Sequence, residues 1–90
     1  MKTIRVKISG QVQGVNFRKY IKEEATKMGL KGHVRNLESG EVEVIIEGSP
    51  ESVDIMVLCC KKGAPHSVVK DIDTQEMNHI GFDDFKILNI

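Results

Sequence analysis

The sequence has little of several features that mark particular classes of protein. Its 13 basic residues balance 13 acidic ones, so no net charge draws the chain to nucleic acid or to an anionic membrane. No stretch approaches the roughly 20 apolar residues of a membrane span. The opening residues Met1–Arg5 also lack the apolar run of a signal peptide. We therefore expect a soluble, cytoplasmic protein with no membrane partner.

Cysteine is scarce, and histidine shows no ligand pattern. Cys59 and Cys60 are adjacent in a predicted helix, where neighbouring side chains point about 100° apart and are poorly placed to bridge each other or to share a metal. We interpret them as packing residues in a reducing compartment. His33, His66 and His79 lack any recurrent spacing of metal ligands. The sequence thus predicts no metal site.

Aromatic residues are few and are absent from the predicted central strand, Val42–Ile46. An RNA-recognition module has a similar order of strands and helices, but it stacks bases on aromatic side chains of its central strands. Without such side chains, and without a basic field, this alternative is disfavoured. We expect no nucleic-acid partner.

Alternating and helical spacings of apolar residues predict the order strand, helix, strand, strand, helix, strand and a short closing strand. The predicted elements are a strand at 2–10, a helix at 17–28, strands at 31–36 and 41–46, a helix at 50–62, an irregular strand with a possible bulge at 67–74, and a last strand near 85–89. This order predicts an α+β fold, the ferredoxin-like βαββαβ sandwich, with an antiparallel sheet and two helices on one face. Residues 1–90 would form one domain.

Several residues are assigned to particular places in this fold. Ser49 is the expected N-cap of the second helix, with Pro50 at its first helical position. Glu43 alternates with apolar residues and is expected on a solvated face. Some apolar surface is expected at residues outside the predicted buried stripes, namely Ile45, Ile55, Leu58 and Cys59. Scattered exposed apolar side chains are normal, so we expect a monomer.

The segment Ser9–Arg18 joins the first strand to the first helix and has the character of an anion cradle. Its glycines, Gly10 and Gly14, suit a turn that exposes N–H groups at the positive end of a helix. Arg18 lies in the first helical turn, where a cation is disfavoured by about 0.3–1 kcal/mol. A bound phosphate or carboxylate would offset this repulsion. A turn glycine and a solvated arginine remain the simpler alternatives.

A nucleotide P-loop does not fit this segment. That motif needs four residues between its glycines and a Lys followed by Ser or Thr. Here three residues separate Gly10 from Gly14, and Val15 follows. The anion, if bound, is therefore not held in a Walker-type loop.

Topology predicts that Asn36 lies beside the cradle. A helical crossover makes the strands 2–10 and 31–36 parallel, with the third strand inserted between them, so their carboxyl ends lie at the same edge. Asn36 ends the second of these strands and shares its face with Val34. The alternative is that Asn36 only shapes the following hairpin.

These groups can bind a phosphoryl group and orient a water, but they include no strong base or nucleophile. Ser9 has no histidine or carboxylate near it in sequence to activate it. An acyl phosphate needs neither, because its leaving carboxylate has a pKa of about 4 and departs unprotonated. An alkoxide from an ordinary phosphate ester would need a general acid or a metal.

The segments that carry this chemistry also carry a resemblance. Gly10–Arg18, Gly32–Asn36 and Gly40–Glu43 resemble the acylphosphatase family in order and spacing, as do Gly63–Pro65 and Asp84–Ile87 near the end. The combination of the V-Q-G-V-x-F-R loop with the later V-R-N is specific. The resemblance implies the ferredoxin-like fold. It also implies hydrolysis of a small acyl phosphate to carboxylate and phosphate, without a metal or cofactor.

Matched residue by residue, the family implies that Arg18 binds the phosphoryl oxygens and that Asn36 holds the attacking water. The main-chain N–H groups that would line the cradle are those of Gln13, Gly14, Val15, Asn16, Phe17 and Arg18. His33 departs from the family, many of whose members carry a larger aromatic residue there. The alternative function is a non-catalytic module that binds phosphate or another anion. Related modules within larger proteins act on carbamoyl phosphate chemistry.

Overall fold

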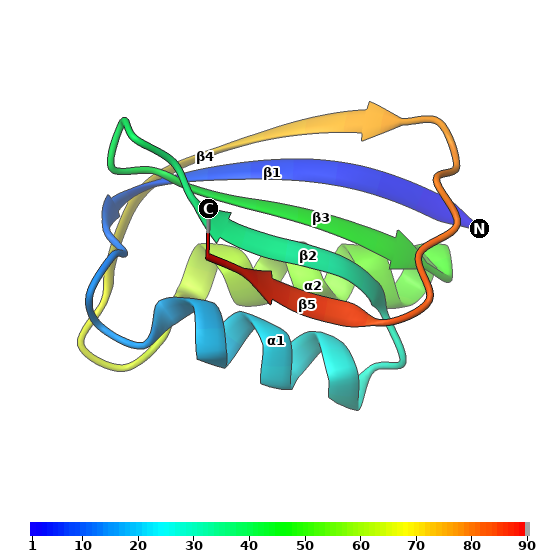
Figure 1. Cartoon of the computed structure of the whole chain (residues 1–90), viewed down its shortest axis with the longest axis horizontal. Helices are drawn as coiled ribbons and strands as arrows, with labels where there is room; N and C mark the ends of the chain where they lie inside the picture. Colours follow the sequence, from blue (N-terminus) through cyan, green and yellow to red (C-terminus); the bar gives the residue numbers. More distant parts are fainter. Residues whose placement is uncertain (90) are drawn as a thin grey trace.

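A computed structural model describes residues 1–89 as a sheet of five strands covered by two helices (Figure 1). The elements are β1 (Lys2–Gln11), α1 (Phe17–Lys27), β2 (Lys31–Asn36), β3 (Val42–Gly48), α2 (Pro50–Lys62), β4 (Val68–Met77) and β5 (Phe85–Leu88). Each agrees with a predicted element to within a few residues. The predicted fold is therefore confirmed.

The strand order β4-β1-β3-β2-β5 places β3 between β1 and β2, as the crossover argument requires. Both β1 and β2 are antiparallel to β3, so they run parallel to each other and end on the same side. The predicted antiparallel sheet has one exception, because β5 pairs in parallel with β2. The loop after β4 carries the chain to the opposite edge of the sheet, and the chain then reverses alongside β2 (Figure 1).

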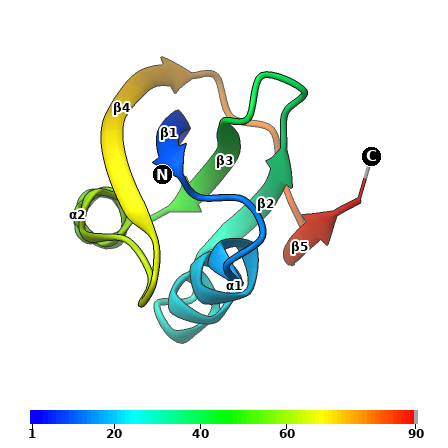
Figure 2. The same ribbon diagram turned by 90° about the vertical axis from the view of Figure 1, so that its left-hand side faces the viewer.

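Both helices cover one face of the sheet, as the end view in Figure 2 shows. Helix α1 buries Phe17, Ile21 and Ala25, the residues whose spacing predicted a single apolar face. Even-numbered residues of β1, β2 and β3 pack against them, in line with the two-residue period of a strand. The core therefore lies between this sheet face and the helices.

The second helix begins as its sequence predicts. Ser49 Oγ accepts a hydrogen bond from the Ser52 N–H at 3.4 Å, and Pro50 occupies the first turn. Cys60 is fully buried, and burial raises the pKa of its thiol to about 12. Cys59 is only partly buried. The cysteines of α2 are thus protonated packing residues, and both thiols are free.

Strand β3 is buried on both of its faces, which corrects two expectations. Ile45 is only 7% exposed, so it leaves no apolar surface, whereas Ile55 and Leu58 of α2 are 53% and 62% exposed. Glu43 is buried rather than solvated. The physical reason is that β3 is the central strand, so long side chains from both neighbouring strands lie over it.

Glu43 is held by three cationic or polar side chains. Arg5 Nε and Arg35 Nε each donate to its carboxylate at 2.7 Å, and His33 Nε2 lies at 3.3 Å. Burial alone would raise the pKa of Glu43, but the hydrogen bonds from Arg35, Arg5 and His33 outweigh it and lower the pKa to about 2. Two flanking strands are thereby tied to the centre of the sheet.

Glu47 fastens the loop that leads into β5. Its carboxylate accepts hydrogen bonds from the Thr3 hydroxyl at 2.6 Å and from backbone N–H groups at 2.8–3.1 Å. The N–H donors belong to Ile80, Gly81 and Phe82. Burial opposes ionisation of Glu47, but these donors lower its pKa to about 2.

Acid is expected to unfold the protein through these two carboxylates. Because the folded-state pKa is depressed, each contributes stability that is fully present above the unfolded pKa of about 4.5 and is lost as pH falls toward 2. Each contributes on the order of 3 kcal/mol. Urea unfolding at several pH values should therefore show a steep loss of stability between pH 5 and 2. Glu47→Gln should flatten this loss, whereas Glu38→Gln, at an exposed carboxylate, should leave it unchanged. Parallel curves for Glu47→Gln and wild type would contradict the assignment.

The irregularity predicted in the fourth strand is a bulge. Ser9 pairs with Asp71 and Gly10 with Val69, so Lys70 is the extra residue on β4. The strand also runs three residues further than predicted, to Met77. This extension pairs with the start of β1, where the chain begins.

Gly32 lies where β2 meets β3, and its substitution is expected to destabilise the fold. Its φ is 141°, and an added Cβ would lie 1.8 Å from the Ile45 carbonyl oxygen. Gly32→Ala should lower the free energy of unfolding by roughly 3 kcal/mol or more, measured by urea denaturation. Gly40→Ala is the matched control, since Gly40 also has a positive φ but open space around it. Equal losses of unfolding free energy in the two variants would show that the positive φ alone causes the destabilisation, and not the contact with Ile45.

No helix among residues 1–89 combines the length and the apolar character that crossing a membrane requires.

Candidate active site

The loop between β1 and α1 forms a concave backbone at one end of the sheet. Gly14 has a φ of 76° and Asn16 a φ of 59°, while the residues between and after them have negative φ. Such an alternation turns successive N–H groups toward one side, in the manner of an anion-binding nest. Val12 and Phe17 lie at the two ends of the loop. Both are 1% exposed and pack in the hydrophobic core.

The N–H groups of this loop have no internal acceptor. None of those from Gln13 to Arg18 donates a hydrogen bond within residues 1–89. Asn16 is the N-cap of α1, but its left-handed backbone leaves its side chain without a capping hydrogen bond. The first turn of a helix always presents unpaired N–H groups, and capping usually satisfies some of them. Here they remain available to a ligand.

Arg18 is partly buried and lies in this uncapped first turn. Its Nη1 donates to Asn89 Oδ1 at 2.7 Å and, more weakly, to the Leu88 carbonyl at 3.4 Å. Within residues 1–89 no carboxylate forms an ion pair with Arg18, and Nε and Nη2 find no acceptor there. The guanidinium therefore keeps donors and positive charge for an anion.

A hollow of about 430 Å³ lies beside Arg18. The β1–α1 loop, which contributes to its lining, is at the left-hand end of the molecule in Figure 1. Figure 2 looks onto this end, where the β1–α1 loop passes close to the ends of β2 and β5. The hollow is lined by Val12, Gly14, Asn16, Phe17, Arg18, Lys19, Ile87 and Asn89. Two of these residues are cationic and none is acidic, so the hollow suits an anion.

The hairpin between β2 and β3 is braced against the cradle. The side chain of Gln13 donates from Nε2 to the carbonyl oxygens of Leu37 and Glu41, both at 3.0 Å. Asn36, the last residue of β2, immediately precedes Leu37, whose carbonyl oxygen accepts one of these hydrogen bonds from Gln13. Its Oδ1 is buried and has no hydrogen-bond partner within residues 1–89. A buried amide oxygen without a partner costs about 1–3 kcal/mol, so it is suited to accept a bond from a bound water.

The predicted site residues thus do not all line the same hollow. Gly14, Asn16, Phe17 and Arg18 line the hollow, whereas Gln13, Val15 and Asn36 do not. Phe17 is in the core, as its apolar spacing predicts. His33 lies on the opposite face of the sheet, edge-on to Phe82 with ring centroids 5.8 Å apart.

Two polar residues of the hollow, Lys19 and Asn89, were not predicted as site residues from the sequence. Asn89 follows the apolar residues Phe85 and Ile87 at intervals of two, so the sequence predicts that all three lie on the same face of the last strand. Nothing in that pattern indicates that this strand ends at Arg18. Lys19 follows Arg18 on an exposed part of α1, and a solvated helix lysine carries no signal of its own.

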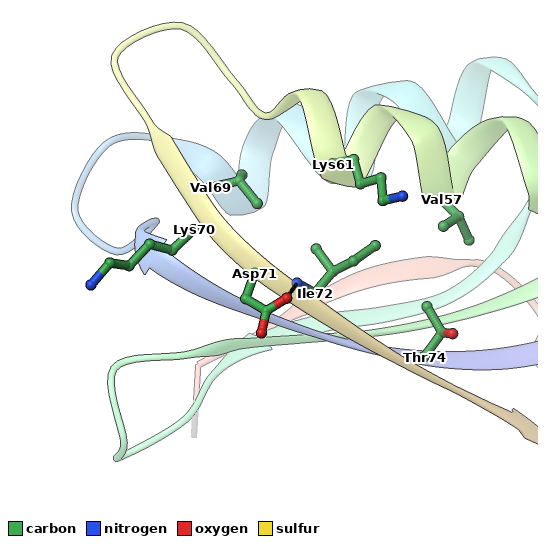
Figure 3. Close-up of a pocket in the computed structure, with 7 residues that line it drawn as sticks. All are labelled: Val57, Lys61, Val69, Lys70, Asp71, Ile72 and Thr74. Carbon is green, nitrogen blue, oxygen red and sulfur yellow. Dashed lines mark hydrogen bonds between the residues drawn. The ribbon is translucent and has the colours of Figure 1, made fainter.

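A second hollow, of about 500 Å³, lies between α2 and β4 (Figure 3). It is lined mainly by side chains of β4 together with Val57 and Lys61 of α2, and Lys70 extends away from the helix. None of the predicted site residues belongs to it. Within residues 1–89, no three His, Cys, Asp or Glu side chains lie close enough together to hold a metal ion.

Comparison with known proteins places this chain in a family. The acylphosphatase family model matches residues 4–87. An acylphosphatase of Methylococcus capsulatus is 42% identical over 89 residues, which cover 98% of this chain and 97% of that protein. The crystal structure of acylphosphatase from Bacillus subtilis superposes with a TM-score of 0.95 at 37% identity, covering 99% of this chain and 100% of that one.

A larger protein contains the same fold as a part. The chain superposes on full-length HypF in its phosphate- and nucleotide-bound form with a TM-score of 0.91 at 32% identity, covering 98% of this chain and 12% of HypF. The family model and the freestanding relatives both span almost the whole chain. The chain therefore belongs to the acylphosphatase family of enzymes.

Proposed function

We propose that the protein hydrolyses acyl phosphates by direct attack of water on a phosphoryl group held in the β1–α1 cradle. The observation that carries this proposal is the cradle itself, in which N–H groups without an internal acceptor lie beside a guanidinium with no carboxylate partner within residues 1–89. The family and its freestanding members support hydrolysis of an acyl phosphate as the reaction.

In the proposed complex, the phosphoryl oxygens accept hydrogen bonds from the backbone of residues 13–18 and from Arg18. The contacts stabilise negative charge on the equatorial oxygens as the transition state forms. Because the donors are fixed by the fold before substrate arrives, they need little reorganisation. The same contacts bind the substrate and hold phosphorus in place for in-line attack.

Asn36 is proposed to hold the attacking water. Its buried Oδ1 accepts one hydrogen bond from this water, which replaces the partner that the oxygen otherwise lacks. An amide is not a base, so the proton of the water passes to a phosphoryl oxygen of the substrate. The water oxygen forms a bond to phosphorus while the bond to the acyl oxygen breaks. The electron pair of that bond leaves with the carboxylate.

The chemistry of the leaving group explains why such a site suffices. A carboxylate departs with a pKa of about 4 and needs neither protonation nor a Lewis acid. We therefore propose that no metal or cofactor takes part. The chain is also proposed to act as a monomer in a reducing compartment, supported by its free thiols and by its scattered exposed apolar residues.

The test is hydrolysis of acetyl phosphate and benzoyl phosphate by the purified protein in excess EDTA. Both should be hydrolysed, whereas methyl phosphate, whose leaving group is an alkoxide, should not. Inactivity toward both acyl phosphates, combined with thermal stabilisation by inorganic phosphate, would instead favour a non-catalytic anion-binding module. Activity that disappears in EDTA and returns with a divalent metal would overturn the metal-free mechanism.

A further inference from the structure

The end of β5 reaches the candidate active site, where Asn89 contacts Arg18. The bond from Nη1 to Asn89 Oδ1 is 2.7 Å long, whereas the same nitrogen lies 3.4 Å from the Leu88 carbonyl oxygen. Since N–H···O bonds centre near 2.9 Å, the first is a strong bond and the second a weak one. Asn89 is therefore the main anchor of this guanidinium among residues 1–89.

The anchor matters because arginine binds phosphate through the plane of its guanidinium. Two parallel N–H···O bonds form only when that plane is correctly oriented. An arginine side chain that is free to rotate loses rotamer entropy when it binds a ligand. Holding Nη1 in advance removes part of this cost. It leaves Nε and Nη2, which have no acceptor within residues 1–89, for the ligand.

The chemical type of the anchor is equally informative. An amide oxygen accepts a hydrogen bond without carrying a charge. A carboxylate in its place would form an ion pair with Arg18 and would repel a phosphoryl group. Asn89 thus orients the guanidinium without adding a negative charge, and no carboxylate within residues 1–89 pairs with Arg18. Elsewhere in this chain Arg5 and Arg35 are instead held by the carboxylate of Glu43, as structural arginines are.

We propose that Asn89 is a positioning residue, which orients Arg18 for the phosphoryl group through a neutral amide oxygen. This inference rests on the proposed function of Arg18. It assigns the closing strand a role in catalysis, because β5 is the element that brings Asn89 to the first turn of α1. The loop before β5 is held by its backbone hydrogen bonds to Glu47, and these contacts stabilise the position of the start of the strand.

The test compares Asn89→Ala, Asn89→Gln and Asn89→Asp with the control Asn78→Ala, an exposed asparagine in the β4–β5 loop. Asn89→Ala should lower kcat/KM for acetyl phosphate about tenfold and weaken inhibition by inorganic phosphate. Asn89→Gln, which keeps the amide oxygen, should restore part of the activity. Asn89→Asp should keep kcat near wild type but raise KM and the phosphate inhibition constant. All variants should unfold at the wild-type temperature, because Asn89 is exposed.

A double-substitution experiment separates this inference from the proposed function. In an Arg18→Lys background the lysine ammonium has no plane to orient. Asn89→Ala should therefore cause little further loss of kcat/KM in that background. A further tenfold loss there would show that Asn89 acts on the substrate directly and would overturn the positioning role. Wild-type activity in Asn89→Ala, with Arg18→Ala inactive, would overturn only the inference about Asn89. Full activity in Arg18→Ala would overturn both.

Discussion

Replacing Arg18 by alanine is expected to lower kcat/KM for acetyl phosphate by about 10³-fold or more. An arginine that stabilises a transferring phosphoryl group contributes about 10³ to 10⁵ in rate in enzymes of phosphoryl transfer. Arg18→Lys should recover only a small part of this, because a lysine ammonium is a point charge and cannot form the paired bonds of a guanidinium. The measurement is steady-state hydrolysis in EDTA, with inhibition by inorganic phosphate as a readout of ground-state binding.

Lys22→Ala is the matched control for Arg18. Lys22 is exposed and lies one turn further along the same helix, so its removal changes the net charge equally but leaves the cradle intact. Its kcat/KM should stay within about twofold of wild type. Removal of Arg18 also removes a cation from the positive end of the helix dipole, a favourable change of about 0.3–1 kcal/mol. A large loss of stability in Arg18→Ala would therefore show that its activity reports unfolding rather than chemistry.

Replacing Asn36 by alanine is expected to lower kcat by about 10² to 10³-fold and to leave inhibition by inorganic phosphate nearly unchanged. The magnitude is that of removing one positioned hydrogen-bonding group from an active site. The separation of the two effects follows from the proposed role, since Asn36 would contact the attacking water and not the phosphoryl oxygens. Single-turnover hydrolysis and phosphate competition, measured on the same preparation, test this separation.

The stability of Asn36→Ala gives an independent check. The substitution removes a buried amide oxygen that has no partner within residues 1–89, so the free energy of unfolding should not decrease and should rise by up to about 1 kcal/mol. Asn78→Ala serves as the control for both activity and stability. Weakened phosphate inhibition in Asn36→Ala would place this residue on the phosphoryl group instead. A loss of stability without loss of kcat would make Asn36 a residue of the hairpin only.

Local signals in the sequence were sufficient for the elements and for part of the site. The spacing of Phe17, Ile21 and Ala25 predicted one buried face of α1, because that face depends only on the helical period. Ser49 and Pro50 predicted the start of α2, because capping is decided within one turn. The cradle was predictable for the same reason: two glycines and a helix start lie within a single short segment.

Burial on the open face of the sheet could not be predicted in this way. The alternation in β3 shows that Glu43 faces away from the helices, but it does not show what covers that face. Its partners Arg5 and Arg35 come from two other strands, and the partners of Glu47 come from β1 and from a loop more than 30 residues later. Charge therefore indicated a solvated face where the structure has a buried network.

The sequence alone determined the order of elements, the glycine-containing loop before α1 and the candidate residues Arg18 and Asn36. Tertiary structure alone decided what surrounds these residues. It pairs β5 in parallel with β2, and it brings Asn89 to Arg18 across 71 positions of sequence. The physical reason is that periodicity and capping are properties of a few consecutive residues. A contact between residues far apart in the sequence, such as Arg18 and Asn89, depends instead on the packing of the elements between them.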